Sequence, residues 1–460
     1  MRLRSIGDVP ARFLEDPHCK TIAELRGVES LVLLPDVHIK QKYVEAGYQC
    51  AVPSSSVTVS HAGFFYPQIR SRGIGCGMAL WPLGIAATQC NDERLETFLL
   101  GLLKTWLRRP SLLTRLDEFL GKKAPACPNV VSPGSFGGRR SAWWSVVRDG
   151  AAGYLSDHRR AEGVRARFEA EGNHLADPAL HPLPDPRTVF SSGFRRGQDF
   201  RGGDHLAGLW LRGNHYVELQ EVSDVYDSEA TARVGLTRGA LALMNHSCGN
   251  GLESVLAPAL VAKRILLPEF RSISPSDPDY RMIRFAVAAL KNLGSVRRAT
   301  FFARAVDAAE RLLPDARVGL LAECNHNDIE WRGEQILYRH NAVKLERGRF
   351  QVVSGFYNHP SYLVQPGPRS EETHDTVGHG LGAWLSEREF VPDPRRRVVR
   401  IGIRPRRGAA GLVAHPVRKR VEVPYFRGDP GDRIVHGLEE AGVIKLVAKL
   451  SPLLSASQAW

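Results

Sequence analysis

Short segments along the chain set cysteine, histidine, asparagine or aspartate among glycines and turn residues. Five of them are Pro35-Asp36-Val37-His38, Gly73-Ile74-Gly75-Cys76-Gly77-Met78, Gly213-Asn214-His215-Tyr216-Val217-Glu218, Asn245-His246-Ser247-Cys248-Gly249-Asn250-Gly251 and Cys324-Asn325-His326-Asn327. A sixth is Gly378-His379-Gly380-Leu381-Gly382. Metal and catalytic sites are usually assembled from side chains of distant segments, so we expect these six to converge.

The donor atoms in these segments point to metal chemistry. One thiolate and three imidazoles, from Cys76, His215, His246 and His326, suit zinc or another first-row metal such as manganese, iron or cobalt. Each residue alone is more often structural, because buried cysteine behaves as a small apolar residue and single histidines commonly fill cores and turns. The joint occurrence of all four is what favours a metal site.

Composition limits the class of protein. The chain has 460 residues with 43% hydrophobic and 24% charged, which is typical of a globular protein and excludes wholesale disorder. No run approaches the roughly 18 apolar residues of a membrane span, and no apolar signal-peptide segment follows the first residues, so we expect a cytoplasmic protein without a membrane partner. Seven scattered cysteines favour reduced thiols over a disulfide framework.

The charge is strongly basic. Lys and Arg number 62 against 49 Asp and Glu, a formal net charge of +13. Ten of these cations lie close together near the C-terminus: Arg395, Arg396, Arg397, Arg400, Arg404, Arg406, Arg407, Arg418, Lys419 and Arg420. They indicate either a nucleic-acid surface or a solvated basic face, and the sequence leaves both open.

Hydrophobic periodicity predicts alternating helices and strands. Residues 92–107 predict a core-facing helix capped by Asn91 or Asp92. Further helices are expected at 159–171, 254–265, 280–293, 297–313 and 434–449. Strands are expected at 30–34, 79–83, 348–354 and 397–403. Residues 125–140 and 172–204 are predicted to be long loops, because they are rich in Pro, Gly and polar residues. The pattern predicts a mixed fold of segregated helices and strands.

The ordered segments resemble the RtcB-type RNA ligase family. Pro35 to His38 is similar to the family's P-D-x-H, Gly73 to Met78 to D-I-x-C-G-[MV], and Gly213 to Glu218 to G-N-H-[FY]-x-E. His246-Ser247 resembles the start of H-S-G-S-R-G, and His326-Asn327 the family's H-N. Ser361-Tyr362 matches the end of P-G-S-M-G-x-x-S-Y, and His379 to Gly382 resembles H-G-A-G-R. The order of the set, rather than any single motif, makes the resemblance specific.

The resemblance implies both a fold and a reaction. The fold is α+β: one large mixed domain over 1–460, with stacked central β-sheets flanked by helices and a loop-rich variable region at 125–204. The reaction joins RNA 3′-phosphate or 2′,3′-cyclic phosphate ends to 5′-hydroxyl ends, with manganese and GTP. His379 would attack the α-phosphorus of GTP to form a histidine-guanylate, and Asp36 would orient His379. The resemblance leaves open an activating helper protein and the oligomeric state.

The same resemblance implies site residues. Cys76 would bridge two metal ions, His246 and His326 would complete one site, and His215 would serve the other. Guanylate would contact Asn214, Tyr216, Val217, Glu218, Asn327, Ser354, Gly355, Phe356, Tyr357, Ser361, Gly380, Leu381 and Gly382.

The sequence departs from the family pattern at several positions. Gly73 stands where the family has a metal-binding Asp, so the ion paired with His215 lacks a carboxylate. Asn250 and Ala383 replace two arginines, and His340 replaces a lysine. Ser457 falls where a C-terminal lysine would hold guanine, which predicts a relaxed choice between GTP and other nucleotides.

These departures keep other interpretations open. Cys248 and Cys324 lie two residues from His246 and His326, so a rearranged site with an extra thiolate is one alternative. A second is a non-catalytic paralogue that retains one metal and binds RNA ends. A third is a metal-dependent phosphodiesterase that does not form a guanylate.

Overall fold

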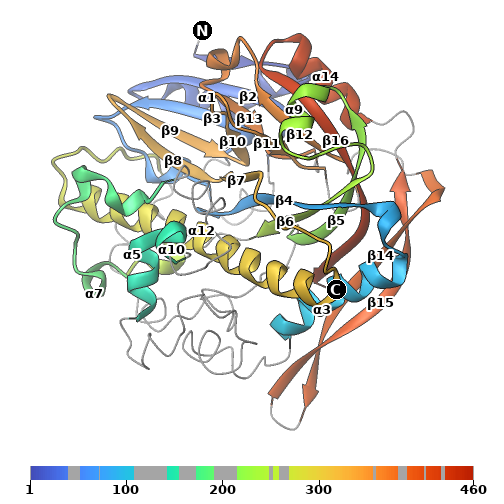
Figure 1. Cartoon of the computed structure of the whole chain (residues 1–460). Coiled ribbons are helices and arrows are strands. Elements are labelled where there is room, and N and C mark those ends of the chain that lie inside the picture. Colours follow the sequence, from blue (N-terminus) through green and yellow to red (C-terminus); the bar gives the residue numbers. More distant parts are fainter. Residues whose placement is uncertain are drawn as a thin grey trace.

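A computed structural model describes most of the chain (Figure 1). The described residues are 2–39, 52–71, 73–107, 142–154, 172–190, 215–247, 252–257, 269–355, 359–381, 391–408, 411–425 and 430–458. The elements build one large sheet, one five-stranded sheet and a two-stranded pair, with helices against them.

The five-stranded sheet carries the N-terminal strands. Its order is β1 (Leu3–Ser5), β2 (Val28–His38), β3 (Ser54–His61), β9 (Gln335–His340) and β8 (Asp328–Arg332). Along β2 the side chains alternate, so that Leu31 and Leu33 pack in one apolar cluster and Val32 and Leu34 in another. Both faces of this sheet are therefore buried.

Within the described residues, the large sheet has nine strands. Its main path is β11 (Gln351–Val353), β12 (Ser361–Pro366), β16 (Ile444–Gln458), β5 (Tyr216–Val225), β6 (Ala240–Ser247), β4 (Gly77–Ala86) and β7 (Ala322–Asn325). Two further strands, β14 (Val391–Gly408) and β15 (Gly411–Tyr425), join it through β16. The two-stranded pair is β10 (Ala342–Lys344) with β13 (Thr376–Gly378).

Helices complete the structure. The α-helices are α1 (Pro17–Glu24), α3 (Asp92–Leu107), α5 (Ala142–Tyr154), α7 (Pro186–Val189), α9 (Ser228–Arg233), α10 (Leu252–Val255), α12 (Pro278–Leu312) and α14 (Pro430–Glu440). Short 3-10 helices are η1 (Ala11–Phe13), η2 (Pro67–Ile69), η3 (Ala87–Gln89), η4 (His174–Ala176), η5 (Pro178–Leu180) and η7 (Ser370–Thr373). None of the described helices is long and apolar enough to cross a membrane.

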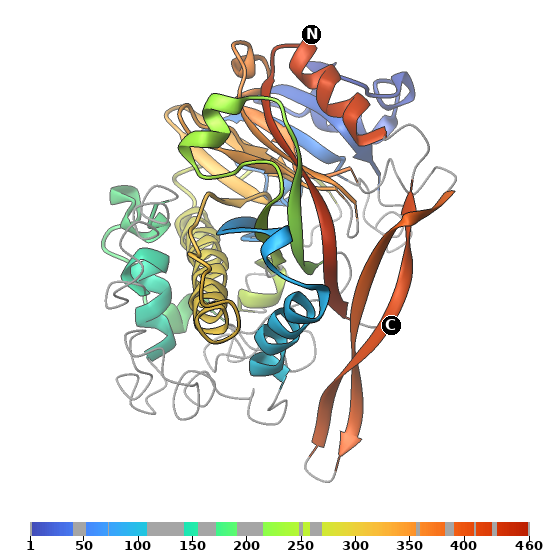
Figure 2. The ribbon, with the colours of Figure 1, turned by 45° about the vertical axis from the view of Figure 1, so that its right-hand side comes forward.

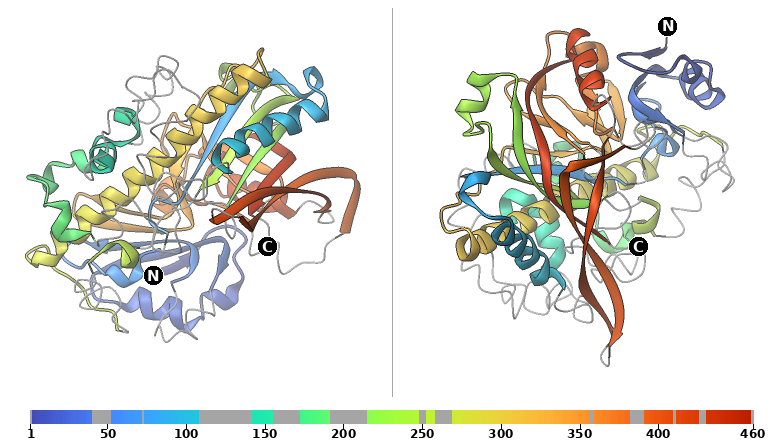
Figure 3. Two further views of the ribbon diagram at one scale, coloured as in Figure 1. Left: turned by 90° about the horizontal axis from the view of Figure 1, so that it is seen from below. Right: turned by 90° about the vertical axis from the view of Figure 1, so that its right-hand side faces the viewer.

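The helices cover the sheets as the mixed class requires. Phe98 of α3 and Phe301 of α12 pack with Trp81 of β4 against one face of the large sheet, and Met78 and Tyr216 belong to the apolar cluster on its other face. Figure 3 shows the long helix α12 lying along the sheets. The predicted α+β class, with central sheets flanked by helices, is confirmed.

The long central helix corrects one prediction. Residues 280–293 and 297–313 were expected as two helices, but they form the single helix α12, from Pro278 to Leu312. Every residue from Phe285 to Ala309 whose burial is described is buried. Polar residues such as Lys291 and Arg298 interrupt the apolar period, yet they find partners inside the protein, so the helix continues through them.

The C-terminal prediction is also corrected. A helix was expected over 434–449, but α14 ends at Glu440 and β16 begins at Ile444. Gly442 has a φ of 74°, a left-handed conformation that commonly ends helices. The buried run that follows is held between β12 and β5, so pairing in the sheet overrides the helical pattern.

The other predicted elements fall mostly where expected. The helix over 92–107 matches α3, and the side chain of Asn91 accepts a hydrogen bond from the backbone N–H of Arg94 at 2.8 Å. The four predicted strands lie within β2, β4, β11 and β14, apart from the ends of the 348–354 stretch. Residues 125–140 and 159–171, with most of 254–265, lie outside the described residues; of 172–204, residues 172–190 include η4, η5 and α7.

Candidate metal and nucleotide site

The candidate site lies at one end of the large sheet. The strands β5, β6, β4 and β7 are antiparallel neighbours, so the starts of β4 and β5 lie beside the ends of β6 and β7. Cys76 and His215 precede β4 and β5, His246 is the penultimate residue of β6, and His326 follows β7. Antiparallel pairing thus carries four distant side chains to one sheet edge.

The donor atoms of these four residues converge. Sγ of Cys76 lies 3.2 Å from Nε2 of His215 and 3.8 Å from Nε2 of His246. Nε2 of His246 lies 3.0 Å from Nε2 of His326. Donors of a tetrahedral metal site stand about 3.3–3.6 Å apart, from bond lengths near 2.0–2.3 Å. We call this set, together with His379, the Cys–His cluster; its spacing fits a first-row divalent ion.

His379 completes the cluster from a different part of the fold. It follows β13, and its ring stacks on that of His326 with centroids 4.1 Å apart. One ring nitrogen each of His246, His326 and His379 lie within 4.8 Å of one another. Nδ1 of His379 donates to the backbone carbonyl of Asn341 at 3.1 Å. A carbonyl cannot donate, so Nδ1 carries the proton and Nε2 keeps the lone pair.

Burial sets the protonation of His326. Desolvation, followed by repulsion from His379, His246, His215 and Arg298, lowers the pKa of His326 well below 6.5. A histidine in this environment is neutral at pH 7, which is the form that binds metal ions.

The loop that carries Cys76 is clamped by a buried arginine. Arg298 of α12 is fully buried; it donates from Nε to Glu323 at 2.5 Å and from Nη1 to the carbonyl of Gly75 at 3.2 Å. Its Nη2 donates to Asn325 at 2.8 Å. One guanidinium therefore ties the helix to both the loop before Cys76 and the strand before His326.

Gly73 stands beside the cluster without a side chain. A Cβ built there would lie 3.6 Å from Cβ of Cys76 and 3.1 Å from Nδ2 of Asn327. Oδ1 of Asn327 accepts from the backbone N–H of Asn341 at 2.8 Å. Asn327 thus connects the Cys76 loop to the residue that holds His379.

Predicted nucleotide residues form a polar group next to the cluster. The hydroxyls of Tyr216 and Ser354 are hydrogen-bonded, and Gly355 donates its backbone N–H to Ser361 at 3.2 Å. Gln220 donates to the buried carboxylate of Glu218 at 2.8 Å. Burial, and then the charge of Glu218, raises the pKa of Tyr216 well above 10, so this phenol is a neutral donor.

The other predicted residues are placed as follows. Gly380 pairs with Ser354 in an isolated bridge, and Leu381 is buried. The side chain of Val217 packs in the apolar core on the opposite face, so Val217 could contact a nucleotide only through its backbone. Asp36 is buried with a φ of 70°, and its part in orienting His379 stays a prediction. Asn214, Cys248, Asn250, Phe356, Tyr357, Gly382 and Ala383 lie outside the described residues.

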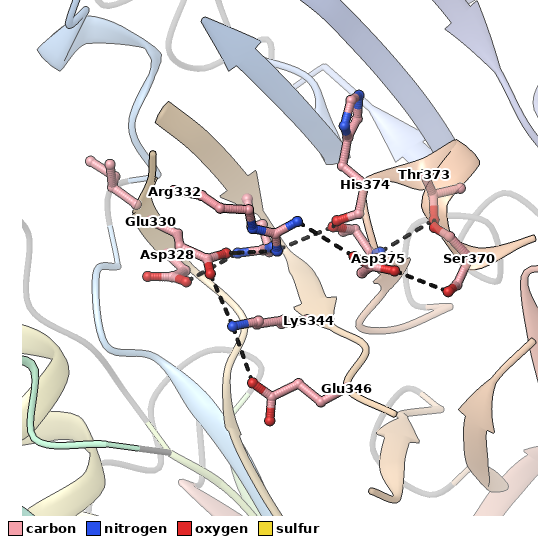
Figure 4. Close-up of polar contacts among 12 residues, drawn as sticks. Asp328, Glu330, Arg332, Lys344, Glu346, Ser370, Thr373, His374 and Asp375 are labelled. Atoms are coloured by element: carbon pink, nitrogen blue, oxygen red, sulfur yellow. Dashed lines mark hydrogen bonds and ion pairs between the residues drawn. The ribbon is translucent and has the colours of Figure 1, made fainter. Parts of the chain in front are cut away.

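An ion-pair network supports the strands that lead to His379 (Figure 4). Arg339 of β9 is fully buried; it donates to Glu330 at 2.7 Å and to the hydroxyl of Thr376 in β13 at 3.1 Å. Glu330 also accepts from Lys344 of β10 at 2.9 Å. The network thus fixes both β10 and β13 to the five-stranded sheet.

Comparison with known proteins identifies the family. A sequence profile described as tRNA-splicing ligase RtcB matches residues 196–457, more than half of the chain. The chain belongs to the RtcB family. It is 23% identical over 472 residues to the RNA-splicing ligase RtcB of Mycobacterium tuberculosis, covering 94% of this chain and 98% of that protein. It is 24% identical over 445 residues to the RNA-splicing ligase RtcB2 of Escherichia coli, covering 95% and 89%.

Sequence reasoning missed Arg298 and the carbonyl of Asn341, two groups that position this RtcB-family cluster. The signal for Arg298 is a charged residue within the apolar stretch of α12, where burial demands a partner. The carbonyl of Asn341 carries no side-chain signal, because any residue type offers one. Asn341 does adopt a φ of 48°, which asparagine tolerates better than most residues.

Proposed function

We propose that this chain is an RNA ligase of the RtcB type, joining RNA 3′-phosphate or 2′,3′-cyclic phosphate ends to 5′-hydroxyl ends with GTP and manganese. Membership of the family supports the reaction class. The single observation that carries the proposal is the convergence of Cys76, His215, His246, His326 and His379 at one sheet edge. A site built on these residues would bring a metal ion, a nucleophilic imidazole and phosphate groups together.

Cys76, His215, His246 and His326 would hold the metal ion. When bound, a divalent ion neutralises charge on phosphate oxygens and favours departure of a phosphate leaving group. The thiolate and imidazoles suit zinc and iron as well as manganese, since no carboxylate stands at Gly73. Metal analysis of the purified protein therefore tests manganese against zinc and iron.

His379 would be the nucleophile. Its Nε2 attacks the α-phosphorus of GTP, the bond from that phosphorus to the bridging oxygen breaks, and pyrophosphate leaves. Where the RNA end is a 2′,3′-cyclic phosphate, water first attacks its phosphorus and the bond to the 2′-oxygen breaks, which leaves a 3′-phosphate and a 2′-hydroxyl. An oxygen of the RNA 3′-phosphate then takes the guanylate, which breaks the N–P bond. Finally the 5′-hydroxyl attacks the 3′-phosphorus and GMP leaves. The hydrogen bond from Nδ1 to Asn341 supports this role, because it leaves Nε2 unprotonated and fixed in direction.

The polar group beside the cluster would hold guanylate. Tyr216, Glu218, Ser354 and Ser361 offer neutral hydroxyls and a carboxylate at one place in the large sheet. The remaining predicted contacts are Asn214, Val217, Asn327, Gly355, Phe356, Tyr357, Gly380, Leu381 and Gly382. We also propose that residues 1–460 form one catalytic domain, with 125–204 as its variable region.

Covalent labelling tests the proposal. The protein is incubated with manganese and GTP labelled at the α-phosphate, then denatured, and the bound label is tested for acid lability, as expected of a phosphoramidate. H379A should carry no label, whereas H436A, which changes a histidine of α14 outside the site, should label as the wild type does. Label that persists in H379A would exclude His379 as the nucleophile.

A second candidate is a paralogue that binds RNA ends without ligation. The observation that favours it is the glycine at position 73, which removes an anionic ligand from the cluster. The two functions separate in one experiment: absence of label at every metal concentration, with retained binding of 3′-phosphorylated RNA, supports the paralogue. Release of the terminal or cyclic phosphate without label would instead indicate a phosphodiesterase.

A further inference from the structure

The ribbon formed by β14 and β15 holds most of the net charge of the protein. Its two strands carry ten Lys and Arg residues against Asp393 and Glu422, a net charge of +8 within a chain of +13. The helix α3, which approaches β15, contributes three carboxylates and two cations, so it cannot neutralise the ribbon.

Strand pairing places charge on both faces of the ribbon. Residues directly opposite each other in an antiparallel pair share a face, and every second residue along a strand lies on that same face. Arg400, opposite Lys419, therefore shares one face with Arg404 and Arg406. Arg407 shares the other face with Arg418, which is opposite Ile401.

The ribbon extends past the edge at which the Cys–His cluster lies. β16 is antiparallel to β5, so β16 runs toward the edge where β5 begins at Tyr216. β14 is parallel to β16, and their pairing stops at Ile403 opposite Gln458. Five residue pairs, from Arg404 opposite His415 to Gly408 opposite Gly411, continue beyond that point. They span about 17 Å at 3.3 Å per residue. Figure 2 shows the ribbon projecting from the body of the molecule.

The strand register also gives the distance from the base of the projecting part of the ribbon to the Cys–His cluster. Gly402 pairs with Ser457, Ser457 with Tyr216, and Tyr216 with His246. Three strand spacings of about 4.8 Å place the base of the projecting part about 14 Å from His246. An RNA whose end occupies the cluster would have its next few phosphates within reach of this basic segment.

We propose that the β14–β15 ribbon is an RNA-binding arm, which contacts the phosphate backbone beside the RNA end held at the Cys–His cluster. The identity of the ligand as RNA rests on the proposed function. Arginine suits this task because its planar guanidinium forms paired hydrogen bonds with phosphate oxygens. Charge on an edge strand also prevents sheet-to-sheet aggregation, but a few charges suffice for that purpose.

Neutralising the projecting part tests the arm. The variant R404Q/R406Q/R407Q removes three charges from it, and R233Q/R311Q/R347Q removes the same number from exposed positions of the body. Binding of a labelled single-stranded RNA with a 3′-phosphate is measured by fluorescence anisotropy over a range of salt concentrations. The ribbon variant should bind on the order of tenfold more weakly, and its salt slope should fall by about 2, at about 0.7 per phosphate contact. The body variant should keep the wild-type slope.

One further variant and the choice of conditions keep the outcome interpretable. R404K/R406K/R407K preserves charge and should bind RNA within a few-fold of wild type, which separates loss of charge from misfolding. All titrations are carried out without GTP, so the arm is tested whether or not the ligase reaction occurs. Equal slopes for the ribbon and body glutamine variants would overturn the proposal, as would binding to phosphatidylserine vesicles but not to RNA.

Discussion

Gly73 limits the number of anionic ligands that the cluster can offer. A side chain at this position would start 3.6 Å from Cβ of Cys76. We expect G73D to raise manganese affinity on the order of tenfold or more, because a carboxylate oxygen is a hard ligand that manganese prefers to imidazole or thiolate. Isothermal titration calorimetry with manganese and zinc measures the change for each ion, and zinc affinity should rise less.

The control for G73D is an uncharged side chain of the same size as aspartate. G73N occupies the same volume and makes the same 3.1 Å approach to Asn327, but adds no charge. Manganese affinity in G73N should stay near that of the wild type. If G73N and G73D gained affinity equally, a carboxylate ligand at this position would not be the cause.

Arg298 contacts the segments that carry Cys76 and His326 without belonging to the Cys–His cluster. R298M leaves the carboxylate of Glu323 buried without its ion-pair partner, which costs about 3–5 kcal/mol of unfolding free energy. It also removes the clamp on Gly75 and Asn325, so we expect metal affinity to fall about 10–100-fold. Urea unfolding and metal titration measure the two effects separately.

A double variant separates the effect of Arg298 on the position of the Cys76 loop from its effect on the unfolding free energy. R298M/E323Q removes both buried charges, so it should recover part of the unfolding free energy lost in R298M. It does not restore the hydrogen bonds to Gly75 and Asn325, and metal affinity should therefore stay low. Recovery of metal affinity together with stability would mean that Arg298 has only a structural role.

At the level of helices and strands, the amphipathic elements are the predictable ones. The helix α3 has one apolar stripe and one solvated side, so its pattern predicts its bounds. From Phe285 to Ala309, every residue of α12 whose burial is described is buried, so the polar residues there depend on partners such as Asp328 and Glu323, which are distant in sequence. A break is predicted between Leu293 and Arg297 because the sequence does not show that these distant partners lie beside the helix.

The site follows the same division. Residue types and order predict which side chains converge, and the antiparallel sheet explains why they meet, since they flank the adjoining ends of neighbouring strands. The groups that hold them in place, Arg298 and the carbonyl of Asn341, depend on packing between elements far apart in sequence. Short-range sequence patterns do not predict such packing.

Gly294 tests the contact between α12 and the Cys76 loop. In an open helix, Gly→Ala stabilises by up to about 1 kcal/mol. A Cβ at Gly294 would lie 2.1 Å from the carbonyl oxygen of Gly75, so G294A must push the loop away. We expect G294A to destabilise the protein by about 1–3 kcal/mol, as overpacking does, and to weaken metal binding.

Gly437 of α14 is the matched control, because, apart from its neighbours and its own helix, no atom of the described residues lies within 4 Å of a Cβ placed there. G437A should therefore stabilise the protein slightly and leave metal binding unchanged. Thermal unfolding and metal titration compare the two variants. A stabilised G294A would show that the loop moves aside without cost and that the close approach of the two glycines has no role.

Across the whole molecule, charge follows two opposite arrangements. In the interior, cations and carboxylates pair across elements, as Arg339, Lys344 and Glu330 do between the five-stranded sheet and the β10–β13 pair. On the β14–β15 ribbon, cations accumulate with few carboxylates. The sequence reveals the second arrangement directly, since those charges are neighbours along the chain, whereas the first becomes visible only when the sheets are assembled.

The interior network predicts how stability depends on pH. Burial alone would raise the pKa of Glu330, but the charges of Arg339 and Lys344 outweigh it and lower the pKa below its usual 4.5. A depressed folded-state pKa contributes stability above the unfolded-state value, and this contribution is lost as the pH falls through 4.5 toward the folded-state value. E330Q should therefore be less stable than wild type at pH 7, by about 3 kcal/mol, because Arg339 loses a buried ionic partner.

The decisive measurement is the difference in unfolding free energy between wild type and E330Q from pH 7 to pH 3. The difference should be constant above about pH 5.5 and should shrink below pH 4.5, since protonated Glu330 resembles the amide that replaces it. E372Q is the control, because Glu372 pairs with Arg369 on the exposed surface, where ion pairs contribute little. A difference that stayed equal at pH 7 and pH 3 would assign the effect of E330Q to packing rather than to the ion pairs that hold β13, and with it His379, in place.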